Sequence, residues 1–189
     1  MQLILASNSP RRKQILLESG YDFKVIPSDY EEKEIVADPK ELVKIYSFNK
    51  ANSVYQGLTD KRDILVLGSD TIVVLDGKIL GKPKDKQHAF SMLKSLSNKT
   101  HQVISGYALI GMKFSLVDLE VTKVTFNELS DAEIKEYIEK MNPLDTAGAY
   151  GIQDGYPLVK SYEGSYNNIV GLPIESIAPL LNKFLKKGE

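Results

Sequence analysis

The sequence opens with an apolar segment that passes directly into a helix-start signal. Residues 2–6 are typical of a buried strand, and Ser9 followed by Pro10 is typical of a helix N-cap and a first helical residue. Similar strand segments alternate along the chain with helical patterns, which begin again near Asp38 and Asp85. This alternation favours an α/β fold.

Hairpin signals interrupt the alternation. Asp76-Gly77 is a strong turn signal that leads into a return segment, and two long strand segments follow at 101–110 and 114–126. A sheet that contains hairpins as well as strand–helix units is mixed. With no linker or repeat in the sequence, we expect one α/β domain over residues 1–189, with helices flanking a mixed central β-sheet.

The last third of the chain is more irregular. Ser130-Asp131-Ala132-Glu133 has capping-box spacing and predicts a helix to about Met141. A glycine-rich stretch at 147–153 follows, then two predicted short strands, and a final helix from Pro173 to Phe184.

A polar segment lies between two apolar strand segments. Gly68-Ser69-Asp70-Thr71 separates 64–67 from 72–75. A lone carboxylate in such a setting is costly to bury, so Asp70 needs a partner, a metal ion or a functional site. The alternative is a turn at a strand end, in which Ser69 and Asp70 bond the local backbone. The residues alone leave both interpretations open.

Other polar residues suit phosphate chemistry but have ordinary alternatives. Arg11 and Arg12 follow a helix start, where free N–H groups and forked guanidinium donors favour anions. Lys82 in Gly81-Lys82-Pro83-Lys84 follows a hairpin that can place a lysine at a phosphate, but for Lys82 and for Lys50 alike a solvated lysine is the commoner case. Glu31-Glu32 has the carboxylates that hold a hard divalent cation beside phosphates, or is a solvated acidic loop.

Composition excludes several classes of protein. A net charge of -1 argues against a general nucleic-acid or anionic-membrane binder. The absence of cysteine excludes disulfides and a cysteine nucleophile, and two histidines make a histidine-rich zinc site a poor expectation. No apolar run is long enough to span a bilayer, and no secretory leader is evident, so we expect a cytoplasmic protein. P-loop, dinucleotide-binding and serine-hydrolase motifs are also absent.

Taken together, six segments in order closely resemble the Maf family of nucleotide pyrophosphatases. They cover nearly the whole chain and read Leu5-Ala6-Ser7-Asn8-Ser9-Pro10-Arg11-Arg12, Gly68-Ser69-Asp70-Thr71-Ile72-Val73, Gly81-Lys82-Pro83, His101-Gln102-Val103, Asp145-Thr146-Ala147-Gly148-Ala149-Tyr150-Gly151-Ile152-Gln153 and Val170-Gly171-Leu172-Pro173. The stretch ending in Gln153 resembles the branch that acts on dTTP and UTP. The residues after it, 154–157, belong to a variable region to which the resemblance gives no weight.

The resemblance implies an elongated Maf/ITPase-like fold with the active site in a cleft. It implies hydrolysis of a nucleoside triphosphate to the monophosphate and pyrophosphate with a divalent cation, Mg²⁺ or Mn²⁺. It also implies a nucleotide-pool housecleaning role, a link to inhibition of septum formation, and a homodimer.

The resemblance also implies roles for nine residues. Asp70 matches the general base, and Glu32 with Asp70 matches the metal site. Arg12, Thr71 and Gln153 match positions associated with substrate choice. The lining of the phosphate end is matched by Ser9, Arg11, Lys50 and Lys82.

Two other functions stay open at this point. One is a nucleotide-responsive regulatory protein that binds without significant turnover. The other is a purine pyrophosphatase of the inosine-triphosphatase kind, which has a similar fold and different motifs.

Overall fold

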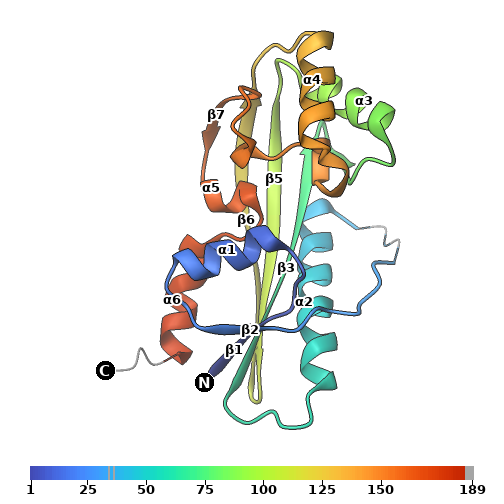
Figure 1. The fold of residues 1–189 in the computed structure, drawn as a ribbon. Coiled ribbons are helices and arrows are strands. Elements are labelled where there is room, and N and C mark those ends of the chain that lie inside the picture. Colours follow the sequence, from blue (N-terminus) through green and yellow to red (C-terminus); the bar gives the residue numbers. More distant parts are fainter. Residues whose placement is uncertain (34, 36, 186–189) are drawn as a thin grey trace.

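The computed structural model describes residues 1–33, 35 and 37–185. The molecule is elongated along its longest strands (Figure 1). The strands are β1 (Gln2–Leu5), β2 (Phe23–Val25), β3 (Ile64–Leu75), β4 (Lys78–Leu80), β5 (Thr100–Gly111), β6 (Phe114–Phe126) and β7 (Val159–Glu163). The helices are α1 (Pro10–Glu18), α2 (Pro39–Gly57), α3 (Lys86–Leu96), α4 (Asp131–Met141), α5 (Tyr166–Val170) and α6 (Ile174–Phe184), with single 3₁₀ turns at Pro143–Asp145, Ala147–Ala149 and Ile152–Asp154.

The strands form one sheet in the order β2-β1-β3-β5-β6-β7, and β4 also pairs with β3. β1 is parallel to both β2 and β3, whereas the pairs β3–β5, β5–β6 and β6–β7 are antiparallel. The predicted α/β class with a mixed sheet flanked by helices is confirmed. The Asp76-Gly77 hairpin is confirmed too, because β4 returns along β3 with Val73 opposite Leu80.

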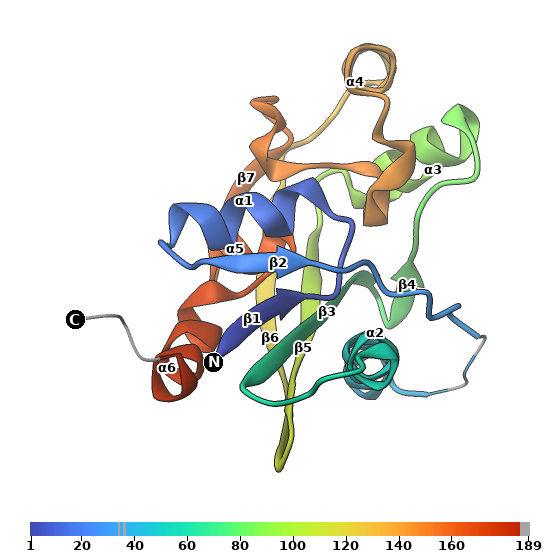
Figure 2. The ribbon, with the colours of Figure 1, turned by 60° about the horizontal axis from the view of Figure 1, so that its bottom comes forward.

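Helices cover both faces of the sheet (Figures 1 and 2). α2 covers one face, where Ala51 and Val54 pack against Val66 and Ala108 of the strands. α1 and α6 cover the opposite face and bury the alternate strand residues, such as Leu65. This alternation follows from the two-residue period of a strand. α3 and α4 cover the far end of the long strands, around Phe126.

Two glycines let α2 approach the sheet closely. A Cβ at Gly68 of β3 would clash with the backbone oxygen of Ser47, and a Cβ at Gly106 of β5 would clash with the backbone oxygen of Val43. The helix therefore rests on bare strand backbone. Val43 and Ser47 are therefore buried, while Phe48 is only partly buried.

Local capping signals in the sequence are realised in the structure. The Ser9 hydroxyl accepts a hydrogen bond from the Arg12 backbone N–H, and Asp38 and Asp85 cap their helices in the same way. Ser130 and Glu133 form the predicted capping box of α4.

The structure excludes one alternative and corrects one prediction. The stretch 68–71 is not a turn, which was one of two open interpretations, because it lies inside β3, which runs unbroken through it and pairs with β5 from Leu65 to Val74. Of the two short strands predicted before Pro173, only β7 forms. The second segment is the helix α5, because Ser165 caps it by accepting from the Asn168 N–H.

Candidate active site

The candidate site lies at a gap in the sheet edge. β1 pairs with β3 only as far as Leu67, and β4 begins to pair at Val73. Between these points, within the described residues, the backbone of β3 pairs with β5 alone, so one edge of the strand is open. The loop after β1 leads to the start of α1 beside this gap. Such an opening at the carboxyl end of a parallel strand is where α/β sheets commonly bind ligands.

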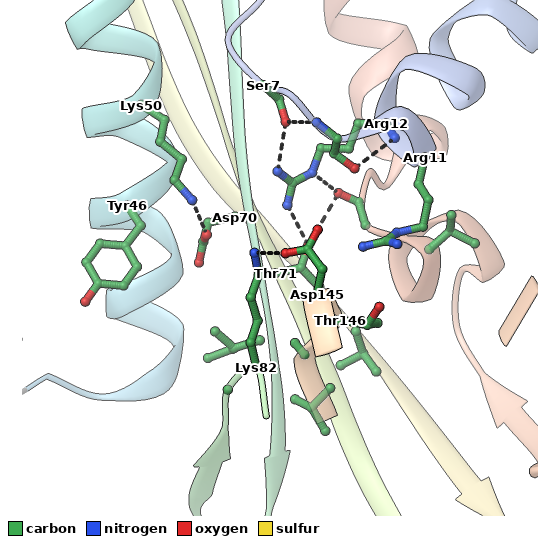
Figure 3. Close-up of a pocket in the computed structure, with 18 of the residues that line it drawn as sticks. Ser7, Arg11, Arg12, Tyr46, Lys50, Asp70, Thr71, Lys82, Asp145 and Thr146 are labelled. Carbon is green, nitrogen blue, oxygen red and sulfur yellow. Dashed lines mark hydrogen bonds and ion pairs between the residues drawn. The ribbon is translucent and has the colours of Figure 1, made fainter. Parts of the chain in front are cut away.

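A cavity of about 970 Å³ occupies this gap. It is lined by residues from β3, α1, α2, the loop after β4 and the irregular stretch before β7 (Figure 3). All nine residues predicted from the sequence line it, namely Ser9, Arg11, Arg12, Glu32, Lys50, Asp70, Thr71, Lys82 and Gln153. The structure thus brings together residues that are up to 144 positions apart in the chain.

Asp70 is the buried acid of the cavity, with only 7% of its surface exposed. It points to the α2 face of the sheet, where Lys50 donates to it from 2.6 Å. The same ammonium donates to Glu32 at 2.6 Å, so one lysine bridges two carboxylates from different segments. The solvated-surface interpretation of Lys50 is therefore wrong, and Asp70 has the partner that its burial requires.

Burial raises the pKa of the Asp70 carboxyl above its ordinary value of 3.8. The Lys50 ammonium acts in the opposite direction, as does the Arg12 guanidinium, while Glu32 reinforces the rise. The desolvation effect is the largest, so the pKa stays raised. A carboxylate with a raised pKa accepts a proton more readily than an exposed one, which suits a general base.

Arg12 and Thr71 meet on the opposite face of β3 from Asp70 (Figure 3). The guanidinium of Arg12 donates to Thr71 Oγ1 at 3.2 Å, to Ser7 Oγ at 3.2 Å and to the Gly171 carbonyl at 2.8 Å. These bonds use three of its five N–H donors and tie α1 to β3 and to the C-terminal end of α5. Burial lowers the pKa of Arg12, opposed chiefly by the Asp70 charge.

Arg11 differs from Arg12 in its surroundings. Its side chain lines the cavity, and within the described part of the chain it makes no hydrogen bond or ion pair. Adjacent helical residues point about 100° apart, which explains how one arginine packs into the protein while the other stays available. Arg11 therefore has its donors available for an anion.

Lys82 meets Asp145 across the cavity at 2.5 Å. Both side chains are exposed, so this ion pair contributes little to folding. The pair brings the loop after β4 to the 3₁₀ turn Pro143–Asp145. A lysine held this loosely is able to exchange its carboxylate partner for a phosphate oxygen.

Gln153 lines the same cavity from the turn Ile152–Asp154. Its side-chain amide donates to Asp154 Oδ1 at 3.3 Å. Asp154 in turn accepts from the buried hydroxyl of Tyr137 at 2.5 Å. The amide is thus connected through one carboxylate to the core of the α3–α4 end.

Sequence reasoning missed three residues that the geometry singles out. Ser7 and Asp145 lie within recognised motifs, but only the fold reveals that they contact Arg12 and Lys82. Asp154 lies in the variable region 154–157, to which the family resemblance gives no weight, yet it contacts Gln153 directly. The available signal for Asp154 was its position in the sequence, directly after Gln153, which matches a position associated with substrate choice.

The acidic residues of the cavity suit a hard cation only with help from a ligand. Among the residues that the structure describes, no three His, Cys, Asp or Glu side chains are grouped closely enough to hold a metal ion. Glu32 and Asp70 nevertheless converge on one positive charge, the Lys50 ammonium. Two carboxylates completed by substrate phosphates are a common arrangement for Mg²⁺. The donor set therefore fits a divalent cation that arrives with a triphosphate.

None of the helices in the described ranges is both long and apolar enough to cross a membrane.

Comparisons with known proteins give matches over nearly the whole chain. The family model described as Maf-like protein matches residues 2–184. The dTTP/UTP pyrophosphatase of Alkaliphilus oremlandii is 48% identical over 95% of this chain and 94% of its own length. Those of a Thermoanaerobacter species and of Thermotoga maritima are 45% and 46% identical, over 97% and 92% of this chain and 96% and 85% of their own.

Among solved structures, a nucleoside-triphosphatase / dITP/XTP pyrophosphatase from Mycobacterium abscessus aligns with 68% of this chain and 76% of its own. Its sequence identity is 14% and the TM-score is 0.42. The family match is far more extensive, since both the family model and the three relatives run along almost the whole sequence. The chain belongs to the Maf-like protein family.

Proposed function

We propose that this chain hydrolyses dTTP and UTP to the nucleoside monophosphate and pyrophosphate, as part of nucleotide-pool housecleaning. The observation that carries the proposal is the buried Asp70, which faces a cavity whose other charged side chains are largely basic. The names of the three pyrophosphatase relatives support the substrate class.

Asp70 is the proposed general base. It accepts a proton from a water molecule whose oxygen attacks the α-phosphorus. A bond forms between that oxygen and phosphorus, and the bond from phosphorus to the oxygen that bridges to the β-phosphate breaks. Pyrophosphate leaves with the electron pair, and no covalent enzyme intermediate is needed. The raised pKa of Asp70 favours this proton transfer.

Basic side chains neutralise the departing pyrophosphate. Arg11 has its donors available, Lys82 exchanges Asp145 for a phosphate oxygen, and Lys50 shifts from Asp70 toward the triphosphate. Because these groups already line the cavity, they are close enough to stabilise the charge that develops on the leaving oxygen. The start of α1, capped by Ser9, adds a positive dipole end.

Glu32 and Asp70 are the proposed holders of a divalent cation, Mg²⁺ or Mn²⁺. When bound, such an ion supplies neutralisation of phosphate charge. With these two carboxylates holding an ion, the Lys50 ammonium that now bridges them would be free to bind the substrate.

Gln153, Thr71 and Arg12 are the proposed determinants of base choice. The amide of Gln153 has one acceptor and two donors and matches the imide edge of uracil and thymine. Thr71 and Arg12 are hydrogen-bonded to each other beside the cavity, so they act as one unit in positioning the nucleotide.

The test is a panel of nucleoside triphosphates assayed under multiple turnover for monophosphate and pyrophosphate, with Mg²⁺ and with Mn²⁺. The expected result is that dTTP and UTP are the best substrates, and that Asp70→Asn, still folded, loses activity by at least about 10²-fold. Glu32→Gln should require more metal, and Glu31→Gln, whose side chain does not line the cavity, should not. Stoichiometric binding without turnover would support a regulatory protein instead, and a preference for inosine triphosphate would support a purine enzyme.

A further inference from the structure

The turn that carries Gln153 folds back on itself around a glycine. Gly151 begins the turn, and a Cβ at this position would lie 2.5 Å from Gln153 Nε2 and 2.7 Å from Asp154 Oδ1. The absence of a side chain at Gly151 leaves room for these two groups to meet, and a Cβ there would push one or both of them aside. The contact between the Gln153 amide and the Asp154 carboxylate therefore occupies the space that the glycine leaves.

Asp154 is itself anchored by the protein core. Its second oxygen accepts from the Tyr137 hydroxyl at 2.5 Å, and the same hydroxyl oxygen accepts the Gly151 N–H at 2.9 Å. Tyr137 lies on α4 with none of its surface exposed, and its ring packs against Tyr156. Burial raises the pKa of Tyr137, so its hydroxyl stays protonated and donates to the carboxylate.

A carboxylate only accepts hydrogen bonds, so it determines which end of an amide can face it. The NH₂ end of Gln153 must lie toward Asp154, as the structure shows, and the carbonyl end is repelled. We propose that Asp154, held by Tyr137, is a positioning residue that fixes the amide orientation of Gln153 and so selects uracil and thymine against cytosine.

This inference rests on the proposed function, and it adds the element that makes base choice possible. Uracil and thymine present an N–H donor at ring position 3 beside a carbonyl acceptor. Cytosine presents an acceptor at that position beside an amino donor. A freely rotating amide could pair with either edge, whereas an amide with one fixed orientation matches one edge and leaves polar groups of the other unpaired.

Asp154→Asn should reverse the orientation. The Tyr137 hydroxyl has accepted the Gly151 N–H and still donates, so it will hold the carbonyl oxygen of the new asparagine. The asparagine NH₂ group then faces Gln153. The glutamine amide has to rotate to present its oxygen there, and its donor and acceptor positions toward the base are exchanged.

The experiment measures kcat/KM for UTP, dTTP and CTP with the wild-type protein and Asp154→Asn. The expected result is a fall in the UTP-to-CTP ratio of at least tenfold, with kcat/KM for CTP rising at least threefold. General damage to the fold lowers kcat/KM for both substrates and cannot raise kcat/KM for one of them. A ratio within twofold of the wild-type value, or parallel losses on both substrates, would overturn the proposal.

A second pair of variants keeps the test decisive if Asp154→Asn does not fold. Tyr137→Phe removes the anchor and should lower the UTP-to-CTP ratio at least threefold, whereas Tyr156→Phe, in the same aromatic cluster but without a bond to Asp154, should leave it unchanged. An unchanged ratio in Tyr137→Phe overturns the proposal. If the wild-type protein does not prefer UTP to CTP, it is the proposed function that fails; if it does and the variants keep that preference, only the positioning role fails.

Discussion

The ammonium nitrogen of Lys50 lies 2.6 Å from a carboxylate oxygen of Asp70, and this contact joins α2 to the open edge of β3. The lysine stabilises the charged carboxylate, whose pKa burial has raised. The ion pair therefore decides how acidic the medium must be before the proposed base is protonated.

Lys50→Met should move the acid limb of the kcat/KM–pH profile to higher pH. The sign follows from the two opposing effects: loss of the ammonium leaves burial unopposed at close range, the pKa of Asp70 rises further, and activity is lost earlier as the pH falls. Turnover at pH 8 should also fall, by about tenfold or more. Lys44→Met on the same helix, where Lys44 pairs with Glu41, is the control and should keep the wild-type profile. An acid limb that stays in place or moves down would contradict the ion-pair argument.

Lys82→Ala should lower kcat/KM for the triphosphate by about tenfold without lowering stability by more than about 0.5 kcal/mol, because the side chain is exposed. Lys84→Ala is a matched control, since Lys84 lies two residues away and does not line the cavity. Steady-state kinetics and urea unfolding of both variants provide the measurement. Equal kinetics for the two would assign Lys82 to the solvated surface.

His101 should make the protein sensitive to acid. Burial lowers the pKa of its imidazole from 6.5 to about 4, so the folded state binds fewer protons than the unfolded state between these values. The contribution of the neutral His101 to the free energy of unfolding is fully present above pH 6.5. It is lost as the pH falls toward 4, by roughly 3 kcal/mol in total. His101→Gln should flatten this part of the unfolding free energy plotted against pH. Replacement of the half-buried His88 by Gln should leave the curve as it is, and identical curves for both variants would contradict the prediction.

Gly106→Ala should destabilise the fold by about 2 kcal/mol or more, because the new Cβ clashes with the backbone of α2 at Val43 and neither element can yield easily. Gly57→Ala provides the comparison. Gly57 ends α2 with open space around its Cα, so alanine there should be neutral or slightly stabilising. Chemical denaturation of the two variants measures the difference. A mild effect of Gly106→Ala would show that α2 can move away from the sheet.

Local signals in the sequence were sufficient for most of the elements. Ser9, Asp38, Asp85 and Ser130 each cap the helix that their spacing predicts, because a cap depends on neighbours three residues away or fewer. The choice between a turn and a functional segment at 68–71 stayed open in the sequence for the complementary reason. Gly68 is used for the close approach of α2, a contact between elements far apart in sequence.

The candidate site was predictable as a set of residues but not as a network. The resemblance identified Lys50, Asp70 and Glu32 separately, and only the fold shows that one ammonium bridges both carboxylates. The Asp154–Tyr137 contact could not be predicted from the sequence for the same reason, since it joins a loop to a helix through a single hydroxyl. Pairwise contacts of this kind depend on the packing of whole elements, which short-range patterns do not encode.

Asp70 sits in the middle of a twelve-residue strand, whereas Gln153 sits on a single 3₁₀ turn that reaches the same cavity from the other end of the molecule. In the proposed roles, the general base and the amide that contacts the nucleotide base therefore lie on different parts of the chain, although Thr71 on the strand and Arg12 also contribute to base choice. Exchange of the turn for one of different sequence would alter the accepted nucleotide while the hydrolytic machinery on the strand stayed intact. A lineage with this architecture can acquire new substrates through a few substitutions, while its catalytic residues stay unchanged.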